Sequence, residues 1–307
     1  MTNLKQQAGQ TLVLTVLFMT VLLGMAAFVI DIGSWFREQR DTQRIADAAA
    51  LAGAQALPEN AAEARVLANQ YTTTNGGSSP QISFRNTVAG TGTDTIQVEI
   101  RREAPGFFAK LFGIDSVDVG ARASARAGYP GAVRWVAPIV VHYQHEKLIC
   151  TPLPCFNQAT EIPLYNLHSP GSGTAAGSFG LISLNNEDVN ANTLAEWLLK
   201  GYDGWTYVDR GYRAAPSANF NNGQFQSALE KRKGTELLFP IYRTIEGEGS
   251  TAQYEVIGWV GFIVEKVTGG GANSKLHGYF TRVVWEGMPG TSAPPVDYGV
   301  RAIELIE

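Results

Sequence analysis

The sequence has little cysteine, no concentration of basic residues and no common nucleotide-binding motif. Its 307 residues carry a formal net charge of −4, and the 24 lysines and arginines are scattered along the chain. The sequence therefore offers no positively charged stripe that could bind a phosphate backbone, and nucleic acid is not expected as a partner. The length allows a membrane anchor together with one or two globular units.

Patterns typical of cofactor binding and catalysis are also missing. The run Gly269–Gly271 lies between two strand-like segments and lacks the Gly-Lys-Ser/Thr of a phosphate loop. Ser172 lies in a loop without the Gly-x-Ser-x-Gly of a nucleophile elbow. His142 and His145 are three residues apart, which places them on opposite faces of a strand. We therefore expect no cofactor, no metal and no enzymatic activity.

The two cysteines, Cys150 and Cys155, lie in the string Cys-Thr-Pro-Leu-Pro-Cys. A structural zinc site would need a second pair of ligands, which the sequence does not supply. Two interpretations remain, a local disulfide and a pair of reduced, buried thiols. An extracytoplasmic location favours the disulfide.

Charge is absent from the twenty residues Thr11–Ile30, which are mostly Leu, Val, Phe, Met, Ile and Ala. As a helix they would extend about 30 Å, the thickness of the bilayer's hydrocarbon core. A cleaved signal peptide is the main alternative, because Lys5 is basic and Ala26 is small, but the apolar run is long for one. We predict a retained transmembrane helix that continues as a helical stalk over residues 31–57, until Pro58 ends it.

Small side chains dominate the end of this stalk. They allow close approach of another helix or sheet, and therefore suggest a packing face between subunits. The simpler interpretation is that alanine favours a helix. The candidates for helix packing are Ala46, Ala49, Ala50, Gly53 and Ala54.

The rest of the chain predicts an α+β fold with mainly antiparallel strands. A helix over 59–71, a hairpin over 82–101, a short helix at 107–112 and a strand over 117–126 form a small α/β unit at 58–130. Strand signals then dominate a β-rich domain at 131–307, with one amphipathic helix over 193–200. The predicted order is a tail at 1–10, a membrane helix at 11–30, the stalk and these two extracytoplasmic parts.

Two groups of aromatic residues have both a structural and a binding interpretation. Phe107, Phe108 and Phe112 are expected to pack in the core, although contact with a membrane or a partner is the alternative. A second group is also expected to be core, with stacking on sugars or docking of a protein as the alternative. It comprises Trp197, Tyr202, Trp205, Tyr207 and Tyr212.

Three strings together resemble the N-terminal region of TadE/TadG-like proteins of Flp (Tad) pilus systems. They are Ala8-Gly9-Gln10, Val29-Ile30-Asp31-Ile32-Gly33 and the run from Gln43 to Ala54. The segment from Phe107 to Ala127 is similar to the end of that family's first extracytoplasmic unit, and later segments resemble TadG-like proteins more loosely. The resemblance implies a single-pass envelope protein that acts in pilus assembly or anchoring through contacts with other Tad subunits and with the lipid bilayer.

Gly9 is the position at which a pilin-type processing site would lie. Such sites have Glu at the fifth residue after the cleaved Gly, whereas this chain has Leu14. The departure counts against cleavage and against a minor pilin in the filament. We expect the N-terminus in the cytoplasm and the bulk of the chain outside, although the basic residues flanking the helix do not decide its orientation. A tethered module that binds carbohydrate or another ligand is the alternative function.

Overall fold

The computed structural model describes residues 4–88, 92–151, 154–163, 179–215, 223–247, 251–269, 275–290 and 296–306, with the backbone alone for 4–10. These residues form two compact units. Unit 1 comprises Met1–Arg85, Thr95–Arg126 and Leu305–Glu307, and unit 2 comprises Asn86–Asp94 and Ala127–Glu304. The α+β class with mostly antiparallel strands is confirmed.

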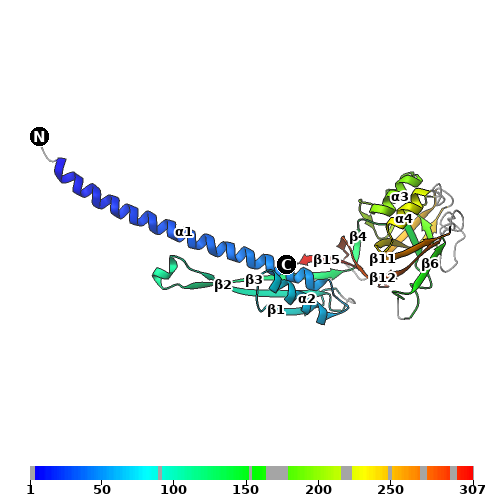
Figure 1. The fold of residues 1–307 in the computed structure, drawn as a ribbon, viewed down its shortest axis with the longest axis horizontal. Coiled ribbons are helices and arrows are strands. Elements are labelled where there is room, and N and C mark those ends of the chain that lie inside the picture. Colours follow the sequence, from blue (N-terminus) through cyan, green and yellow to red (C-terminus); the bar gives the residue numbers. More distant parts are fainter. Residues whose placement is uncertain are drawn as a thin grey trace. The chain divides into compact units, whose positions relative to one another are not determined.

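Unit 1 is built on one helix, α1, which extends from Leu4 to Ala54 (Figure 1). Its 51 residues correspond to about 77 Å at 1.5 Å per residue. The helix ends three residues before the predicted end at 57, and a turn follows over 55–59. The membrane helix and the stalk of the prediction are therefore one uninterrupted element.

A short helix and three antiparallel strands of a five-stranded sheet lie along the C-terminal half of α1 (Figure 1). The helix α2, Ala61–Thr74, begins at Asn60, whose side chain accepts a hydrogen bond from the backbone N–H of Glu63. The strands are β1 (Gln81–Arg85), β2 (Thr95–Pro105) and β3 (Ser116–Gly128), with the 3₁₀ helix η1 (Ala109–Phe112) between β2 and β3. Their order is β1-β2-β3.

The alternation along β2 explains which face of this sheet is buried. Ile96, Val98 and Ile100 are fully buried, whereas the intervening Gln97 and Glu99 are only partly covered. This is the period of two expected for a strand with one face on a core. The buried face packs on α1, so the sheet and the stalk share one core.

The connection between β1 and β2 belongs to unit 2, although the sequence assigned it to the first extracytoplasmic part. Asp94 is fully buried, and its carboxylate accepts hydrogen bonds from the backbone N–H groups of Thr87 and Val88, each at 2.8 Å. Its carbonyl accepts a hydrogen bond from the N–H of Ala127. These local bonds hold the connection within unit 2.

Unit 2 contains a seven-stranded sheet. Six of its strands follow the order β6-β12-β11-β10-β5-β7, and the seventh, β9, pairs with β11. Among the described strands of this sheet, only β5 and β10 pair in parallel. The strands are β5 (Ile139–His142), β6 (Ala159–Pro163), β7 (Phe179–Leu181), β9 (Arg210–Arg213), β10 (Glu236–Glu246), β11 (Gln253–Thr268) and β12 (Lys275–Thr281).

Two helices cover this sheet, and short strands complete unit 2. The helices α3 (Ala191–Lys200) and α4 (Gly223–Lys231) pack against each other (Figure 1). A small sheet has the order β14-β4-β8, and β13 pairs with β15 in parallel. The short elements are β4 (Pro130–Val133), β8 (Thr206–Tyr207), β13 (Val283–Val284), β14 (Gly287–Pro289) and β15 (Val300–Ile306).

One core cluster of unit 2 lies between the large sheet and the helices, and a second cluster, which includes Tyr254 and Trp259, packs separately in the same unit. Phe239 stacks on Phe262 with ring centroids 5.0 Å apart, and Phe262 meets Phe280 edge to face. Leu194 and Phe225 from the two helices join the same cluster. Aromatic pairs of this kind add to the stabilisation that apolar burial already provides.

Candidate functional site

The N-terminal half of α1 presents an apolar surface on all sides. Its large apolar side chains between Leu12 and Ile30 are 45–68% exposed, and the most apolar stretch has no buried residue. A helix that is apolar all round is stable in hydrocarbon and unfavourable in water. Among the described residues, α1 alone is long and apolar enough to cross a membrane.

The small side chains near the end of α1 pack inside their own chain. Ala46, Ala49, Ala50 and Ala54 are fully buried, and Gly53 is buried with them, where α1 contacts α2 and β2. A Cβ at Gly53 would lie 2.5 Å from Cδ1 of Ile96. The sequence suggested this face as a packing surface between subunits, but one chain already covers it.

Polar side chains on α1 hold β2 and β3 along the middle of the helix. They face the strands at successive turns of the helix. The closer such a side chain lies to the N-terminus of α1, the closer its partner lies to the β2–β3 connection. The contacts are Gln43 Nε2 to Arg122 O at 3.1 Å, Gln39 Nε2 to Gly120 O at 2.5 Å, Glu38 Oε1 to Arg102 Nη1 at 2.7 Å and Trp35 Nε1 to Pro105 O at 3.2 Å.

Asp31 ends this series at the edge of the apolar run. Its side chain is almost fully buried and accepts hydrogen bonds from three consecutive backbone N–H groups, those of Phe107, Phe108 and Ala109, at 2.5–3.2 Å. Amides at the start of a helical turn have no partner within that turn, so a carboxylate satisfies them well. Asp31 therefore fixes the β2–β3 connection to α1.

We predict that Asp31→Ala releases this connection from the helix. The three amides would lose their shared acceptor, and charge-assisted hydrogen bonds of this kind are the stronger ones. Hydrogen–deuterium exchange should show faster exchange at residues 107–109, by roughly tenfold or more. Ser34→Ala, on the same turn of α1, is the control. Unchanged protection in Asp31→Ala would contradict the capping role.

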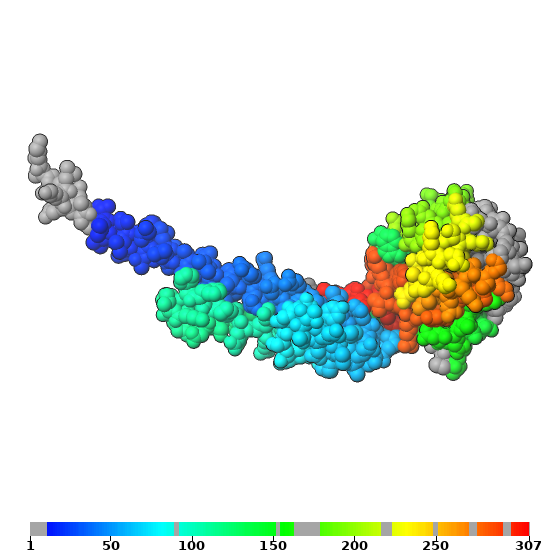
Figure 2. All heavy atoms as spheres, in the orientation of Figure 1, coloured from blue at the N-terminus to red at the C-terminus, as the bar shows by residue number. Residues whose placement is uncertain are grey.

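The apolar residues of the β2–β3 connection are exposed. Phe112 is 85% and Leu111 is 81% exposed, and Phe107 is 60% exposed, so the expected core position of the phenylalanines is wrong. The connection extends beyond the end of the sheet. There Asp31 of α1 bonds to its backbone but leaves these side chains exposed. It forms the teal end of the hairpin beside α1 (Figure 2).

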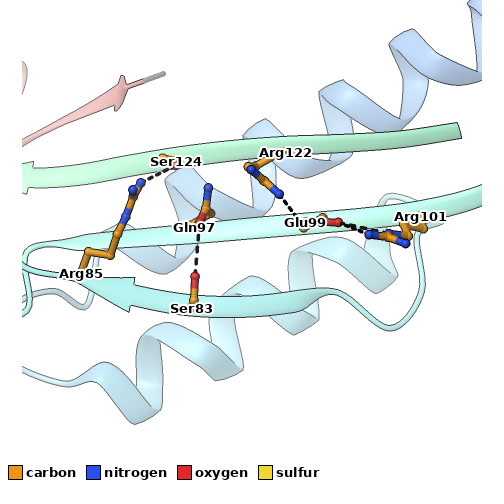
Figure 3. Close-up of polar contacts among 7 residues, drawn as sticks. All are labelled: Ser83, Arg85, Gln97, Glu99, Arg101, Arg122 and Ser124. Atoms are coloured by element: carbon orange, nitrogen blue, oxygen red, sulfur yellow. Dashed lines mark hydrogen bonds and ion pairs between the residues drawn. The ribbon is translucent and has the colours of Figure 1, made fainter.

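The outer face of the sheet carries an array of polar contacts instead (Figure 3). Glu99 accepts hydrogen bonds from Arg101 and Arg122, each at 2.9 Å, and these two arginines lower the pKa of its carboxyl group. Arg85 donates to Ser124 Oγ at 3.2 Å. This face is water-exposed in character and differs sharply from the apolar end of the hairpin.

In unit 2, Cys150 and Cys155 are joined by a disulfide with their Cα atoms 5.8 Å apart. The backbone N–H of Cys155 donates to the carbonyl of Lys147, which closes the same turn. The bond ties together a short loop that follows β5. Such a bond persists in an oxidising compartment.

Replacing both cysteines with serine is expected to destabilise unit 2 by up to about 2 kcal/mol, the value for closing a loop this short. Urea unfolding followed by tryptophan fluorescence measures this loss. Reduction of the unmodified protein should give the same loss, and the double variant should not respond to reductant. An equal midpoint for the two proteins without reductant would contradict a stabilising disulfide.

The two histidines near the end of β5 have separate surroundings. His145 is buried, accepts a hydrogen bond at Nδ1 from the backbone N–H of Lys147, and packs its edge on Phe179 and Phe280. Burial lowers the pKa of His145 to about 4. His142 instead packs beside Tyr242. The described residues contain no group of three or more side chains suited to a metal ion.

The predicted aromatic patch does not form one surface. Tyr212 is buried and its hydroxyl accepts a hydrogen bond from the N–H of Tyr207, while Trp197 and Tyr202 meet at an interplanar angle of 63°. Tyr207 and Trp205 remain partly exposed. The five rings therefore do not share one exposed face. Ser172 lies outside the described residues, as do Gly270 and Gly271 of the glycine run.

Comparison with known families connects the membrane-proximal part with pilus assembly. Residues 9–56 match the model described as putative Flp pilus-assembly TadE/G-like, and residues 36–125 match the one described as putative Tad-like Flp pilus-assembly. Residues 9–125, which one model or the other matches, are similar to these Flp pilus-assembly families and are here called the TadE/TadG-like region. The resemblance predicted from the sequence is thereby confirmed for this region. No curated protein and no solved structure matches the chain.

The TadE/TadG-like region contains all the features that connect α1 to its sheet. Asp31 lies in the first matched segment, the exposed hairpin end lies in the second, and Glu38 and Gln43 lie in both. The role of Asp31 was not predicted from the sequence. The signal in the sequence was Asp31 itself, a carboxylate directly after twenty uncharged residues. A carboxylate at the edge of an apolar span is poorly hydrated and needs hydrogen-bond donors from the protein.

Proposed function

We propose that this chain is a membrane-anchored structural component of Flp pilus assembly, of the TadG type, that acts through protein contacts and without catalysis. One observation carries the proposal: in the TadE/TadG-like region, an exposed apolar helix continues without a break into a folded stalk. The apolar half is suited to a bilayer, and the other half is already covered by its own sheet and α2. The chain thus joins a membrane helix to a rigid support.

The proposed orientation places unit 2 outside the cytoplasm. The disulfide supports this, because such bonds are rare in the reducing cytosol. Unit 2 then offers its surfaces to other subunits of the pilus system.

The mature N-terminus and the cell fraction of the protein test this proposal together. In the native host we expect mass spectrometry to find residues 1–10 still attached, and the protein to remain in the membrane when pili are sheared off. The matched variant Leu14→Glu restores the Glu of a pilin-type site, and is expected to raise cleavage after Gly9 if the pilin peptidase meets this helix.

Two results would overturn the retained anchor. Cleavage of the unmodified chain after Gly9, with recovery in sheared pili, would make it a minor pilin. Loss of residues through Ala26, with release into the medium, would identify the apolar run as a signal peptide.

A further inference from the structure

The connection between β2 and β3, residues 106–115, is here named the hairpin tip. The N–H of Gly106 donates to the carbonyl of Asp115 at 2.9 Å and closes the tip at its base. Five large apolar side chains within it are 41–85% exposed, namely Phe107, Phe108, Leu111, Phe112 and Ile114. So dense an apolar surface marks a site that another apolar phase covers.

The contacts between the hairpin and α1 determine where this surface lies along the helix. Ile96 lies at Gly53, Arg102 pairs with Glu38, and the tip bonds to Asp31. From Gly53 to Asp31 the helix advances about 33 Å, and from Ile96 to Phe107 a strand advances about 36 Å. The strand thus follows the helix toward its N-terminus, and the tip lies level with Asp31.

Asp31 is the first charged residue after the uncharged run Thr11–Ile30, so this level is the boundary of the proposed membrane span. Aromatic rings are typical of that boundary, with long basic side chains reaching toward the headgroups. On α1 the same boundary has Trp35 and Phe36, the latter 66% exposed, followed by Arg37. The tip adds its phenylalanines and the exposed Lys110 at this level.

We infer that the hairpin tip inserts Phe107, Leu111 and Phe112 into the interface of the bilayer that α1 crosses. The inference rests on the proposed retention of α1 in the membrane. The chain then contacts the bilayer at two points, and the Asp31 contact prevents the hairpin from moving independently of the helix. Lys110 and Asp115 cancel within the tip, so apolar burial provides the attraction and anionic lipid is not required.

Site-specific fluorescence of the full chain in phosphatidylcholine vesicles tests this inference. Single cysteines at Leu17, Phe112 and Ser83 are labelled with an environment-sensitive dye under non-reducing conditions, where the native cysteines are paired. Leu17 reports on the span, Phe112 on the tip and Ser83 on the exposed outer face of the sheet. The unmodified chain controls for labelling of Cys150 and Cys155.

We expect the dye at Phe112 to shift to the blue and to be quenched several-fold more by nitroxide-labelled phosphatidylcholine than the dye at Ser83. Leu111→Cys should behave like Phe112→Cys. The quenching should not depend on salt or on added anionic lipid. Asp31→Ala should reduce quenching at the tip and leave quenching at Leu17 unchanged.

The three dye positions distinguish a failure of the membrane anchor from a failure of the insertion of the tip. A quenched dye at Leu17 with an unquenched, water-exposed dye at Phe112 would overturn the insertion of the tip and keep the anchor. A blue-shifted dye at Phe112 that lipid nitroxides do not quench would show that protein covers the tip, which also overturns the inference. An unquenched dye at Leu17 would refute the anchor itself.

Discussion

Gly53→Leu is expected to separate α1 from the elements packed on it. A Cβ at this position would lie 2.5 Å from Cδ1 of Ile96 and 2.9 Å from the backbone oxygen of Ala64, and leucine adds three further carbons. The Ile96 side chain can move, whereas the α2 backbone cannot move without losing its packing. Overpacking of a tight core costs about 3 kcal/mol at the upper end of its usual range, and we expect that loss here.

Hydrogen–deuterium exchange of the α2 amides measures this loss in the full chain. The amides of residues 61–74 should exchange more than tenfold faster, since about 1.4 kcal/mol corresponds to tenfold. Gly33→Leu, on the same helix, is the matched control, because apart from its chain neighbours and the nearby helix backbone no atom lies within 4 Å of a Cβ at Gly33. Equal protection in the two variants would mean that α2 does not pack on α1.

Acidification from pH 7 to pH 4 is expected to destabilise unit 2 by up to about 3 kcal/mol through His145. The pKa of this histidine falls from 6.5 to about 4 because burial disfavours its charged form. Its stabilisation is fully present above pH 6.5, where both states are neutral. It is lost as the pH falls toward 4, because the unfolded chain binds the proton first.

The variant His145→Asn removes this titration and keeps an acceptor for the N–H of Lys147. Its urea midpoint should change less between pH 7 and pH 4 than that of the unmodified chain. Gln144→Asn, exposed on the same turn, controls for the effect of a substitution there. A variant with the same pH dependence as the unmodified protein would exclude His145 as the source of the acid sensitivity.

The elements with strong patterns were predictable from the sequence, and the contacts between distant segments were not. The uncharged run at 11–30 predicts the apolar helix because only apolar residues suit hydrocarbon. The alternation in Thr95–Arg101 predicts β2. Strand β6 was missed because Ala159–Pro163 is short and has few β-branched residues; its pairing with β12 forms the strand. Helix α4 was missed in the same way, since it is a short helix that packs against α3.

The hairpin tip shows why composition alone misplaced its phenylalanines. Clustered aromatics are usually buried, and Phe107, Phe108 and Phe112 were expected in the core on that ground. Their exposure follows from the length of β2 and β3, which extend past the core as far as Asp31. The bond that holds the tip beside Asp31 joins residues 76 positions apart, and no local pattern reports such a bond.

The interleaved division of the chain has a mechanical consequence. The backbone passes between the two units at 85/86, 94/95, 126/127 and 304/305. A pulling force on unit 2 is therefore shared among four peptide links instead of one. A protease that cuts at 126/127 would divide the chain into residues 1–126 and 127–307, each of which still carries residues of both units. The two fragments would separate only when such a segment leaves the unit in which it packs, so under the proposed function a single cut between the units would not by itself detach unit 2 from the anchor.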